Sequence, residues 1–369
     1  MKTRLMLVIP TMDRGGAEKQ LSLLATGLPR DRFEVCVVLL TRGGPLESSL
    51  LDAGLSVVHC NKKWKLDPFA YQRLKKTIRS FRPDIVHTWI FAANCYGRAA
   101  AWRAGVPIIL GGERCVDLWK RWHELVLDRF FAKRTSGILT NSEGVKDFYV
   151  QHGIPASQFH VIPNGVTAIP QDASSARNAL IQKLGLPSET RLVGTVGRLW
   201  PQKRLKDAIW AIELLKCVRN DTHLLIAGEG PQRWRLERYA EQVGVHHRVH
   251  FLGHVEQAAS LIASLDQFWI CSGYEGQSNA LMEALSQGVP VIASDIPGNR
   301  DLVTHEETGL LFQVGDRAEL AKQSERLSHN PDFAKQLGLA GQQKMLTEFS
   351  VEMMVKRHID CYAQFLQGC

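Results

Sequence analysis

Short apolar runs rich in β-branched residues alternate along this chain with longer segments of helical pattern. In the first half the runs occupy residues 5–10, 33–40, 55–60, 84–89, 106–112 and 136–142. In the second half they occupy residues 191–199, 223–230, 249–255, 267–273 and 289–295. Apolar strands separated by helices are typical of parallel sheets, because each strand is buried on both faces by the crossover helices. The sequence therefore predicts an α/β protein.

The chain is too long for one hydrophobic core. It has 369 residues, whereas single cores stop growing at roughly 250–300 residues. The strand rhythm pauses at FHVIPNGVTAIPQD (159–172), which is rich in Pro, Gly and Asn. We therefore expect two consecutive Rossmann-like domains, 1–166 and 167–349, with a hinge near residues 163–170.

Composition is that of an ordinary globular protein, with 45% hydrophobic and 22% charged residues. No stretch reaches the ~18 apolar residues of a membrane span, and the apolar part of MKTRLMLVIP is too short for a signal peptide. The eight cysteines form no C-x-x-C pair or metal-ligand cluster, which indicates reduced thiols and no structural metal site. We expect a cytoplasmic protein, with peripheral attachment to the cytoplasmic face of the inner membrane as a further option.

The net charge of +8 is unevenly distributed. Residues 1–165 carry 24 Lys+Arg against 14 Asp+Glu, and residues 166–369 carry 21 against 23. Much of the excess lies in 61–82 and 117–134, where tryptophans and phenylalanines alternate with the cations. Such segments suit an anionic membrane surface, and they equally suit solvated amphipathic helices with aromatic residues facing the core. Nucleic acid is not expected, because no recognised binding motif accompanies the charge.

A glycine pair follows the first predicted strand. Gly15 and Gly16 lie where a strand turns into a helix, so their N–H groups could approach an anion. A plain glycine-rich turn explains them equally well. A dinucleotide site is not indicated, because G-x-G-x-x-G is absent and no acidic residue ends the second strand.

The second half carries a stronger pattern at the strand ends. Arg198 and Lys203 follow one strand, Gly228 follows the next, and Glu275 precedes a helix that contains Glu283. The predicted first turn of that helix comprises Gly276, Gln277, Ser278, Asn279 and Ala280. Cations and a helix N-terminus can neutralise a diphosphate, and carboxylates can accept hydrogen bonds from sugar hydroxyls. The sequence thus predicts a nucleotide-sugar site, with Glu283 on the ribose and Glu275 on the transferred sugar or its phosphate. The alternatives without a ligand are that Glu283 is a surface residue of a helix and that Lys203 is a solvated surface cation.

Five motifs in order resemble those of the retaining glycosyltransferases of family 4. They are GGAE near the N-terminus, VIPNGV (161–166), GRLWPQK (197–203), E-x7-E from Glu275 to Glu283, and EALSQGVPVIASDIPGNRDLV (283–303) followed by TGLL. The resemblance covers nearly the whole chain. It implies the GT-B fold, with an acceptor-binding first domain, an NDP-sugar-binding second domain, catalysis in the cleft between them and a last helix, 350–369, that crosses back to the first domain.

The resemblance also implies roles for individual residues. Arg198 and Lys203 would stabilise the leaving diphosphate, N–H groups around Gln277–Ala280 would bind phosphate or sugar hydroxyls, and neither a metal ion nor a cofactor other than the NDP-sugar co-substrate is expected. Where many members have a histidine after the fifth strand, this chain has Glu113 followed by Arg114. Either of these is then expected to contact donor or acceptor. His87, at the end of the fourth strand, is a further candidate contact, although a structural role explains it as well.

Three functional hypotheses follow. The first is an active transferase that moves a hexose or N-acetylhexosamine from a UDP- or GDP-sugar to a glycan or lipid-linked acceptor in cell-surface polysaccharide or glycolipid synthesis. The second is a non-catalytic nucleotide-sugar-binding partner subunit, suggested by the missing histidine. The third is a GT-B enzyme of other chemistry, such as an epimerase or a phosphorylase.

Overall fold

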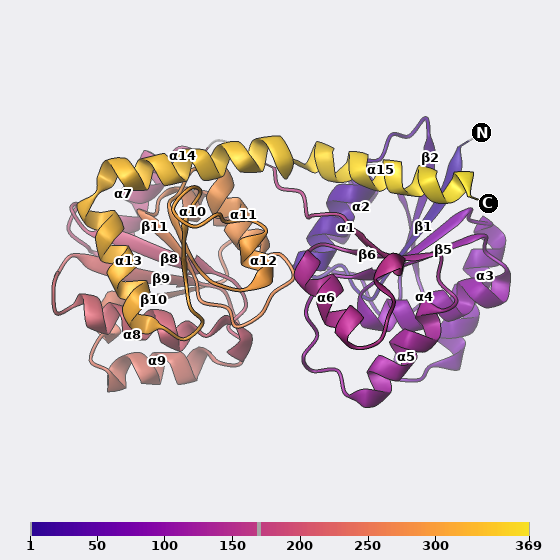
Figure 1. Cartoon of the computed structure of the whole chain (residues 1–369), viewed down its shortest axis with the longest axis horizontal. Helices are drawn as coiled ribbons and strands as arrows, with labels where there is room; N and C mark the ends of the chain where they lie inside the picture. The colour runs from indigo at the N-terminus through magenta and orange to yellow at the C-terminus, as the bar shows by residue number, and fades with distance from the viewer. Residues whose placement is uncertain (1, 168–170, 369) are drawn as a thin grey trace. The chain divides into compact units, whose positions relative to one another are not determined.

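The computed structural model describes residues 2–167 and 171–368 and divides the chain into two compact units. The first unit comprises Met1–Gly165 together with Val351–Cys369, and the second comprises Val166–Ser350 (Figure 1). The expected hinge near 163–170 lies partly outside the described residues, since 168–170 are not among them. Within the described ranges no helix is both long and apolar enough to cross a lipid bilayer.

The first unit is built on a seven-stranded parallel sheet in the order β3-β2-β1-β4-β5-β6-β7. Its strands are β1 (Thr3–Ile9), β2 (Phe33–Leu39), β3 (Ser56–His59), β4 (Ile85–Trp89), β5 (Ile108–Glu113), β6 (Gly137–Thr140) and β7 (Phe159–Val161). Its helices are α1 (Gly16–Gly27), α2 (Glu47–Asp52), α3 (Pro68–Phe81), α4 (Ile90–Ala104), α5 (Trp122–Ala132), α6 (Glu143–Gln151) and α15 (Val351–Gln367).

Both faces of this sheet are covered. Leu5, Leu7 and Ile9 of β1 pack on one face with residues of α1 and α15, and Met6 and Val8 pack on the other with residues of α3 and α4. The alternation follows from the two-residue period of a strand, which sends successive side chains to opposite faces. The last helix therefore belongs to the core of the first unit.

The second unit contains a six-stranded parallel sheet in the order β10-β9-β8-β11-β12-β13. The strands are β8 (Arg191–Val196), β9 (Thr222–Ala227), β10 (Val249–Gly253), β11 (Gln267–Ile270), β12 (Val291–Ser294) and β13 (Leu310–Phe312). The helices are α7 (Ala173–Leu184), α8 (Leu205–Leu215), α9 (Arg233–Gln242), α10 (Ala258–Ala263), α11 (Asn279–Ser286), α12 (Pro297–Arg300), α13 (Arg317–His329) and α14 (Pro331–Glu348).

All eleven predicted strands are present, and the α/β prediction is confirmed. The strands β7 and β13 were not predicted, because each has only three residues, too few to show the two-residue period of a strand. The predicted start of the helix after β11 was wrong: α11 begins at Asn279 with Ser278 in extended backbone as its N-cap, so Gly276–Ser278 belong to the preceding loop.

Candidate functional site

The candidate site lies where the strand order of the second sheet reverses. β8 and β11 are neighbours, while β9 and β12 continue the sheet in opposite directions. In doubly wound sheets ligands bind outside the carboxyl ends of the strands at this reversal, because the two loops diverge there and leave a crevice. The loops concerned are residues 197–204 after β8 and residues 271–278 after β11.

Lys203 and Glu275, predicted independently from two motifs, form an ion pair across this point. The Glu275 carboxylate also accepts a hydrogen bond from the Ser272 hydroxyl at 2.8 Å. Gln202 donates through Nε2 to the Tyr274 carbonyl oxygen at 2.8 Å and to Glu275 Oε2 at 3.4 Å. The carboxylate is thus held in one place with a cation beside it.

Arg198 stands on the same loop as Lys203. Its guanidinium lies 5.6 Å from the centre of the Trp200 ring, and Arg198, Lys203 and Ser272 line one small pocket. Two cations and a hydroxyl therefore converge at the edge of the sheet, which suits an anionic ligand.

Gly228 allows the loops after β8 and β9 to pack together. A Cβ atom at this position would come within 1.9 Å of the Gly197 carbonyl oxygen, and its φ of +136° disfavours any other residue. The backbone of Leu199 completes the contact, because its N–H donates to the Glu229 carbonyl at 2.9 Å. Gly228 thus shapes the loop that carries Arg198.

A supporting layer that sequence reasoning missed fixes the loop before α11. Ser294 donates to the Ser272 carbonyl oxygen at 2.6 Å, and Asn299 donates to the Ser294 carbonyl oxygen at 2.9 Å. Gly298 approaches so closely that a Cβ would lie 1.8 Å from the Gly276 carbonyl oxygen. The segment SDIPGN (294–299) was visible as a motif, but only its contacts show what it supports.

The remaining predicted residues of the second unit lie at the start of α11. Gln277 and Ser278 are buried and Ala280 is half-buried. Their backbone lies at the helix N-terminus, because Ser278 is the N-cap of α11 and Ala280 is its second residue. Glu283 is half-buried between Met282 and Ala284, which are buried. The roles assigned to these residues stay predictions.

Gly15 and Gly16 lie in the first unit, after β1. Gly15 is the N-cap of α1 in extended backbone, and Gly16 is the first residue of the helix. β1 and β4 are the neighbours at the reversal of the first sheet. The glycine turn therefore stands at the ligand-binding edge of its own unit, and its role as an anion site stays a prediction.

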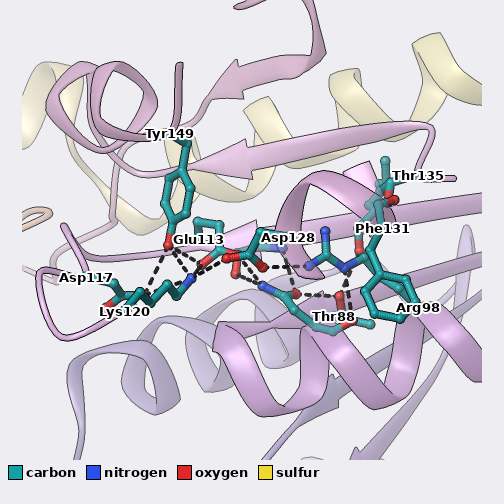
Figure 2. A network of polar contacts seen from close by, with 12 residues as sticks. Thr88, Arg98, Glu113, Asp117, Lys120, Asp128, Phe131, Thr135 and Tyr149 are labelled. Atoms are coloured by element: carbon teal, nitrogen blue, oxygen red, sulfur yellow. Dashed lines mark hydrogen bonds and ion pairs between the residues drawn. The ribbon is translucent and has the colours of Figure 1, made fainter. Parts of the chain in front are cut away.

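Glu113, at the end of β5, is 3% exposed and belongs to a buried polar network (Figure 2). Its carboxylate accepts hydrogen bonds from Asn94 Nδ2 at 2.8 Å and from the Tyr149 hydroxyl at 2.9 Å, and Lys120 Nζ lies 3.5 Å away. Lys120 also pairs with Asp128 at 2.9 Å. Both Glu113 oxygens are engaged inside the unit, and its expected contact with donor or acceptor stays a prediction.

His87 and Arg114 lie on the face of the first sheet that α15 covers. His87 is 1% exposed, and its Nδ1 lies 2.8 Å from the Tyr362 hydroxyl of α15. Burial and the neighbouring His358 and Arg114 hold the pKa of His87 well below its usual range. These contacts support the structural role of His87 that the sequence analysis named as an alternative. A contact between His87 and a ligand stays a prediction.

No group of three or more His, Cys, Asp or Glu among the described residues is placed to hold a metal ion.

Comparisons with known proteins cover both units. The family model described as Glycosyltransferase Family 4 matches residues 14–168, and the model described as Glycosyl transferases group 1 matches residues 176–344. The chain is 28% identical over 311 residues to UDP-Gal:alpha-D-GlcNAc-diphosphoundecaprenol alpha-1,3-galactosyltransferase of Escherichia coli, covering 78% of each chain. It is 32% identical over 263 residues to the GDP-mannose-dependent alpha-mannosyltransferase of Mycobacterium tuberculosis, covering 66% of this chain and 64% of the relative.

Among solved structures, the crystal structure of Anabaena HepE in complex with UDP and glucose superimposes with a TM-score of 0.88. That match covers 98% of this chain and 100% of the other, at 21% identity. At this identity the likeness shows a shared fold.

Proposed function

Because the chain belongs to the glycosyltransferases of family 4 and group 1, which have the GT-B fold and act with nucleotide sugars, we propose that it is a retaining hexosyltransferase. The donor is a UDP- or GDP-linked hexose or N-acetylhexosamine. The acceptor is a glycan or lipid-linked sugar in cell-surface polysaccharide or glycolipid synthesis. Two relatives named for a UDP-sugar and a GDP-sugar respectively support this range of donors.

The observation that carries the proposal is the meeting of Lys203, Arg198 and Glu275 at the reversal of the second sheet, next to the start of α11. In the proposed complex the donor diphosphate displaces Glu275 as the partner of Lys203. Arg198 and the N–H groups at the start of α11 share the remaining charge. Glu275 is then free to accept hydrogen bonds from the sugar, and Glu283 binds the ribose.

The proposed reaction is a front-face transfer with retention. The bond between the anomeric carbon and the diphosphate oxygen breaks, and the acceptor hydroxyl forms its new bond on that same face. The departing phosphate takes the hydroxyl proton, so the products are the glycoside and the free nucleoside diphosphate. Catalysis rests on positioning and on cations at the developing negative charge. In this proposal the two cationic side chains carry the role that a metal ion has elsewhere.

An anionic membrane surface is the proposed location of the acceptor. The basic aromatic segment comprises residues 61–134, in which α3 packs against α4 and α4 against α5 (Figure 1). In this range no carboxylate is exposed: Asp84 and Asp117 are half-buried and the other four are buried. Ten cations are exposed there, Lys63, Lys65, Arg73, Lys76, Arg79, Arg82, Arg103, Arg121, Arg129 and Lys133.

The same segment exposes aromatic side chains. Trp64 is 58% exposed, Phe69 65%, Trp119 55%, Trp122 76% and Phe130 43%. Helices with core-facing aromatics, the alternative from sequence, would bury these rings, as α5 does bury Phe131. Exposed indole and phenyl rings among exposed cations fit the interface of an anionic bilayer, where the rings enter the headgroup region and the cations meet the phosphates.

The first experiment is a thermal-shift screen of the purified chain against UDP, GDP, ADP and their hexose conjugates. A ligand present at 100 times its Kd stabilises by about 2.7 kcal/mol, which corresponds to a rise in Tm of roughly 5–10 °C for a unit of this size. Glu283→Ala should lose the shift, whereas Glu241→Ala, an exposed glutamate of α9, should keep it. If no nucleotide raises the Tm, the transferase proposal fails.

A second measurement separates the enzyme from a non-catalytic partner subunit. The chain is incubated with the stabilising nucleotide sugar and candidate acceptors, and release of the nucleoside diphosphate is followed. Binding with release supports the enzyme. Binding without release, across acceptors that differ in sugar and in lipid tail, favours the partner subunit, the reading motivated by Glu113 in place of the family histidine.

A further inference from the structure

Arg114 is a buried cation that has no hydrogen-bond partner for its side chain among the described residues. The residue is 8% exposed, and its Nε and Nη2 atoms are buried and unpaired. The guanidinium lies over the Trp89 ring, 4.1 Å from its centre. Trp89 Nε1 and His358 Nε2, in the same aromatic cluster, also lack partners. Most buried polar groups are hydrogen-bonded, so four such atoms in one place require an explanation.

The charge of Arg114 is also uncompensated. Among the described residues no carboxylate forms an ion pair with it, and its neighbours are aromatic side chains of the α15 face. Burial and the nearby Arg114 lower the pKa of His358 to about 3, so that imidazole is neutral at pH 7. Burial also lowers the pKa of Arg114 itself to about 9. An isolated buried charge is costly unless a partner meets it.

Glu113 and Arg114 lie next to each other but face opposite sides of the sheet. Glu113 points toward α4, where Asn94 donates to it, and toward α6, where Tyr149 donates to it, as Figure 2 shows. Arg114 points toward Trp89 and α15. Glu113 and Arg114 stand where the family histidine is expected. Of these two residues, only Arg114 has unpaired hydrogen-bond donors.

The backbone beside this cluster is strained. Ile90, the residue after Trp89, has a φ of +59°, which is an outlier for a β-branched side chain. Such strain persists where the surrounding structure enforces it, and it gathers at ligand sites. Ile90 follows β4 at the reversal of the first sheet, and Arg114 follows the neighbouring strand β5. Both therefore stand at the edge of the sheet where ligands bind.

We propose that Arg114 binds a phosphate group of a substrate, through the edge of the guanidinium that carries Nε and Nη2. These two N–H groups point in the same direction and match two oxygens of one phosphate. The side chain leaves the Trp89 ring by rotation about its own bonds, and the phosphate supplies the partner that the buried cation lacks. The inference rests on the proposed function, and the phosphate is that of the donor or that of a diphosphate-linked acceptor.

The test is calorimetry with two probes, on wild type and on two variants. UDP or GDP, whichever the thermal screen selects, reports on the donor site. Inorganic pyrophosphate, titrated into protein saturated with that nucleotide, reports on a separate phosphate site. Arg114→Met removes the donors and keeps a stem that packs on Trp89, and Arg114→Lys keeps the charge without the two-pronged edge.

If Arg114 holds the donor phosphate, Arg114→Met weakens nucleotide binding at least tenfold. If it holds an acceptor phosphate, nucleotide binding is unchanged, and the wild type takes up pyrophosphate while Arg114→Met does not. In both cases the affinity of Arg114→Lys lies between the affinities of the wild type and Arg114→Met. The Tm of Arg114→Met is equal to or above that of the wild type, because an unpaired buried charge has been removed.

The proposal is overturned if Arg114→Met binds nucleotide and pyrophosphate as the wild type does. A purely structural role for the cation over Trp89 would instead appear as a lower Tm with unchanged binding. Failure of the proposed function looks different, since no nucleotide would then stabilise the wild type. In that event pyrophosphate is titrated into nucleotide-free wild type and nucleotide-free Arg114→Met, and the difference between them still reports on the phosphate site.

Discussion

Replacement of Lys120 by methionine should destabilise the first unit strongly. The Lys120 side chain is 0% exposed. Its Nζ lies 2.9 Å from Asp128, 3.2 Å from Asp117 and 3.5 Å from Glu113, and it donates to the Tyr149 hydroxyl at 2.6 Å (Figure 2). Breaking a buried ion pair by removal of one partner costs about 3–5 kcal/mol, because the remaining charge stays buried and uncompensated.

The charge balance shows why the upper half of that range is expected. The network holds three carboxylates against two cations, Lys120 and Arg98, and of these three carboxylates Arg98 pairs with Asp128 alone, at 3.2 Å. Without Lys120, Glu113 and Asp117 have no cation. Since native domains are stable by about 5–15 kcal/mol, the loss takes a large part of the unit's stability.

The loss of stability caused by Lys120→Met should depend on pH in a defined direction. Burial and the nearby Glu113 already raise the pKa of Asp128 to about 6, and burial also raises the pKa of Asp117. Loss of the Lys120 cation raises these carboxyl pKa values further, so the folded variant binds protons more readily than the unfolded chain. Protonation removes the uncompensated charge. The stability gap between variant and wild type is therefore largest near pH 8 and shrinks toward pH 5.

Urea unfolding, monitored by hydrogen exchange in peptides from β5 to α6, measures the first unit separately from the second. Glu113→Gln in the Lys120→Met background should restore part of the loss, since it removes one unpaired charge. Lys146→Met, which breaks an exposed ion pair with Glu143, is the matched control and should have little effect. A loss below about 1 kcal/mol for Lys120→Met, or a gap that widens on acidification, would refute the reasoning.

Four further outcomes are expected. Lys203→Met should lower kcat and kcat/KM together by roughly 10²–10³-fold, because its cation acts on the charge of the leaving group; an unchanged kcat in steady-state assays would exclude that role. Gly228→Ala should abolish the nucleotide-induced rise in Tm, since its Cβ would lie 1.9 Å from a carbonyl oxygen, and a normal shift would show that the loop can yield. His358 has a folded pKa of about 3 against about 6.5 unfolded, so stability should fall by roughly 1 kcal/mol for each pH unit between about 6.5 and about 3, and His358→Phe should reduce that slope in pH-dependent urea titrations. Trp122→Ser should weaken binding to phosphatidylglycerol vesicles roughly tenfold in co-sedimentation, with Trp234→Ser, a 58% exposed residue of the second unit, as control; equal binding of the two variants would remove α5 from the membrane surface.

The motif residues of the second unit were predictable because their chemistry is tied to strand ends. Once β8 and β11 are recognised as strands of a doubly wound sheet, Lys203 and Glu275 must emerge at the same edge, and the structure pairs them. The residues that hold this pair in place were not predictable. Ser294 and Gly298 act through a hydroxyl and a missing Cβ on a third loop, and no local pattern states which carbonyl they approach.

Sequence by itself determined the α/β fold with its parallel strands and placed cations at the strand ends, because hydrophobic period and chain order are local properties. Only the tertiary structure decided which neighbours each side chain points toward. It directed Glu113 into a saturated network and left Arg114 unpaired on the opposite face, and it exposed Trp122 while burying Phe131 of the same helix. Burial and pairing depend on which distant elements, such as α15, arrive beside a residue, and that information is spread over the whole chain.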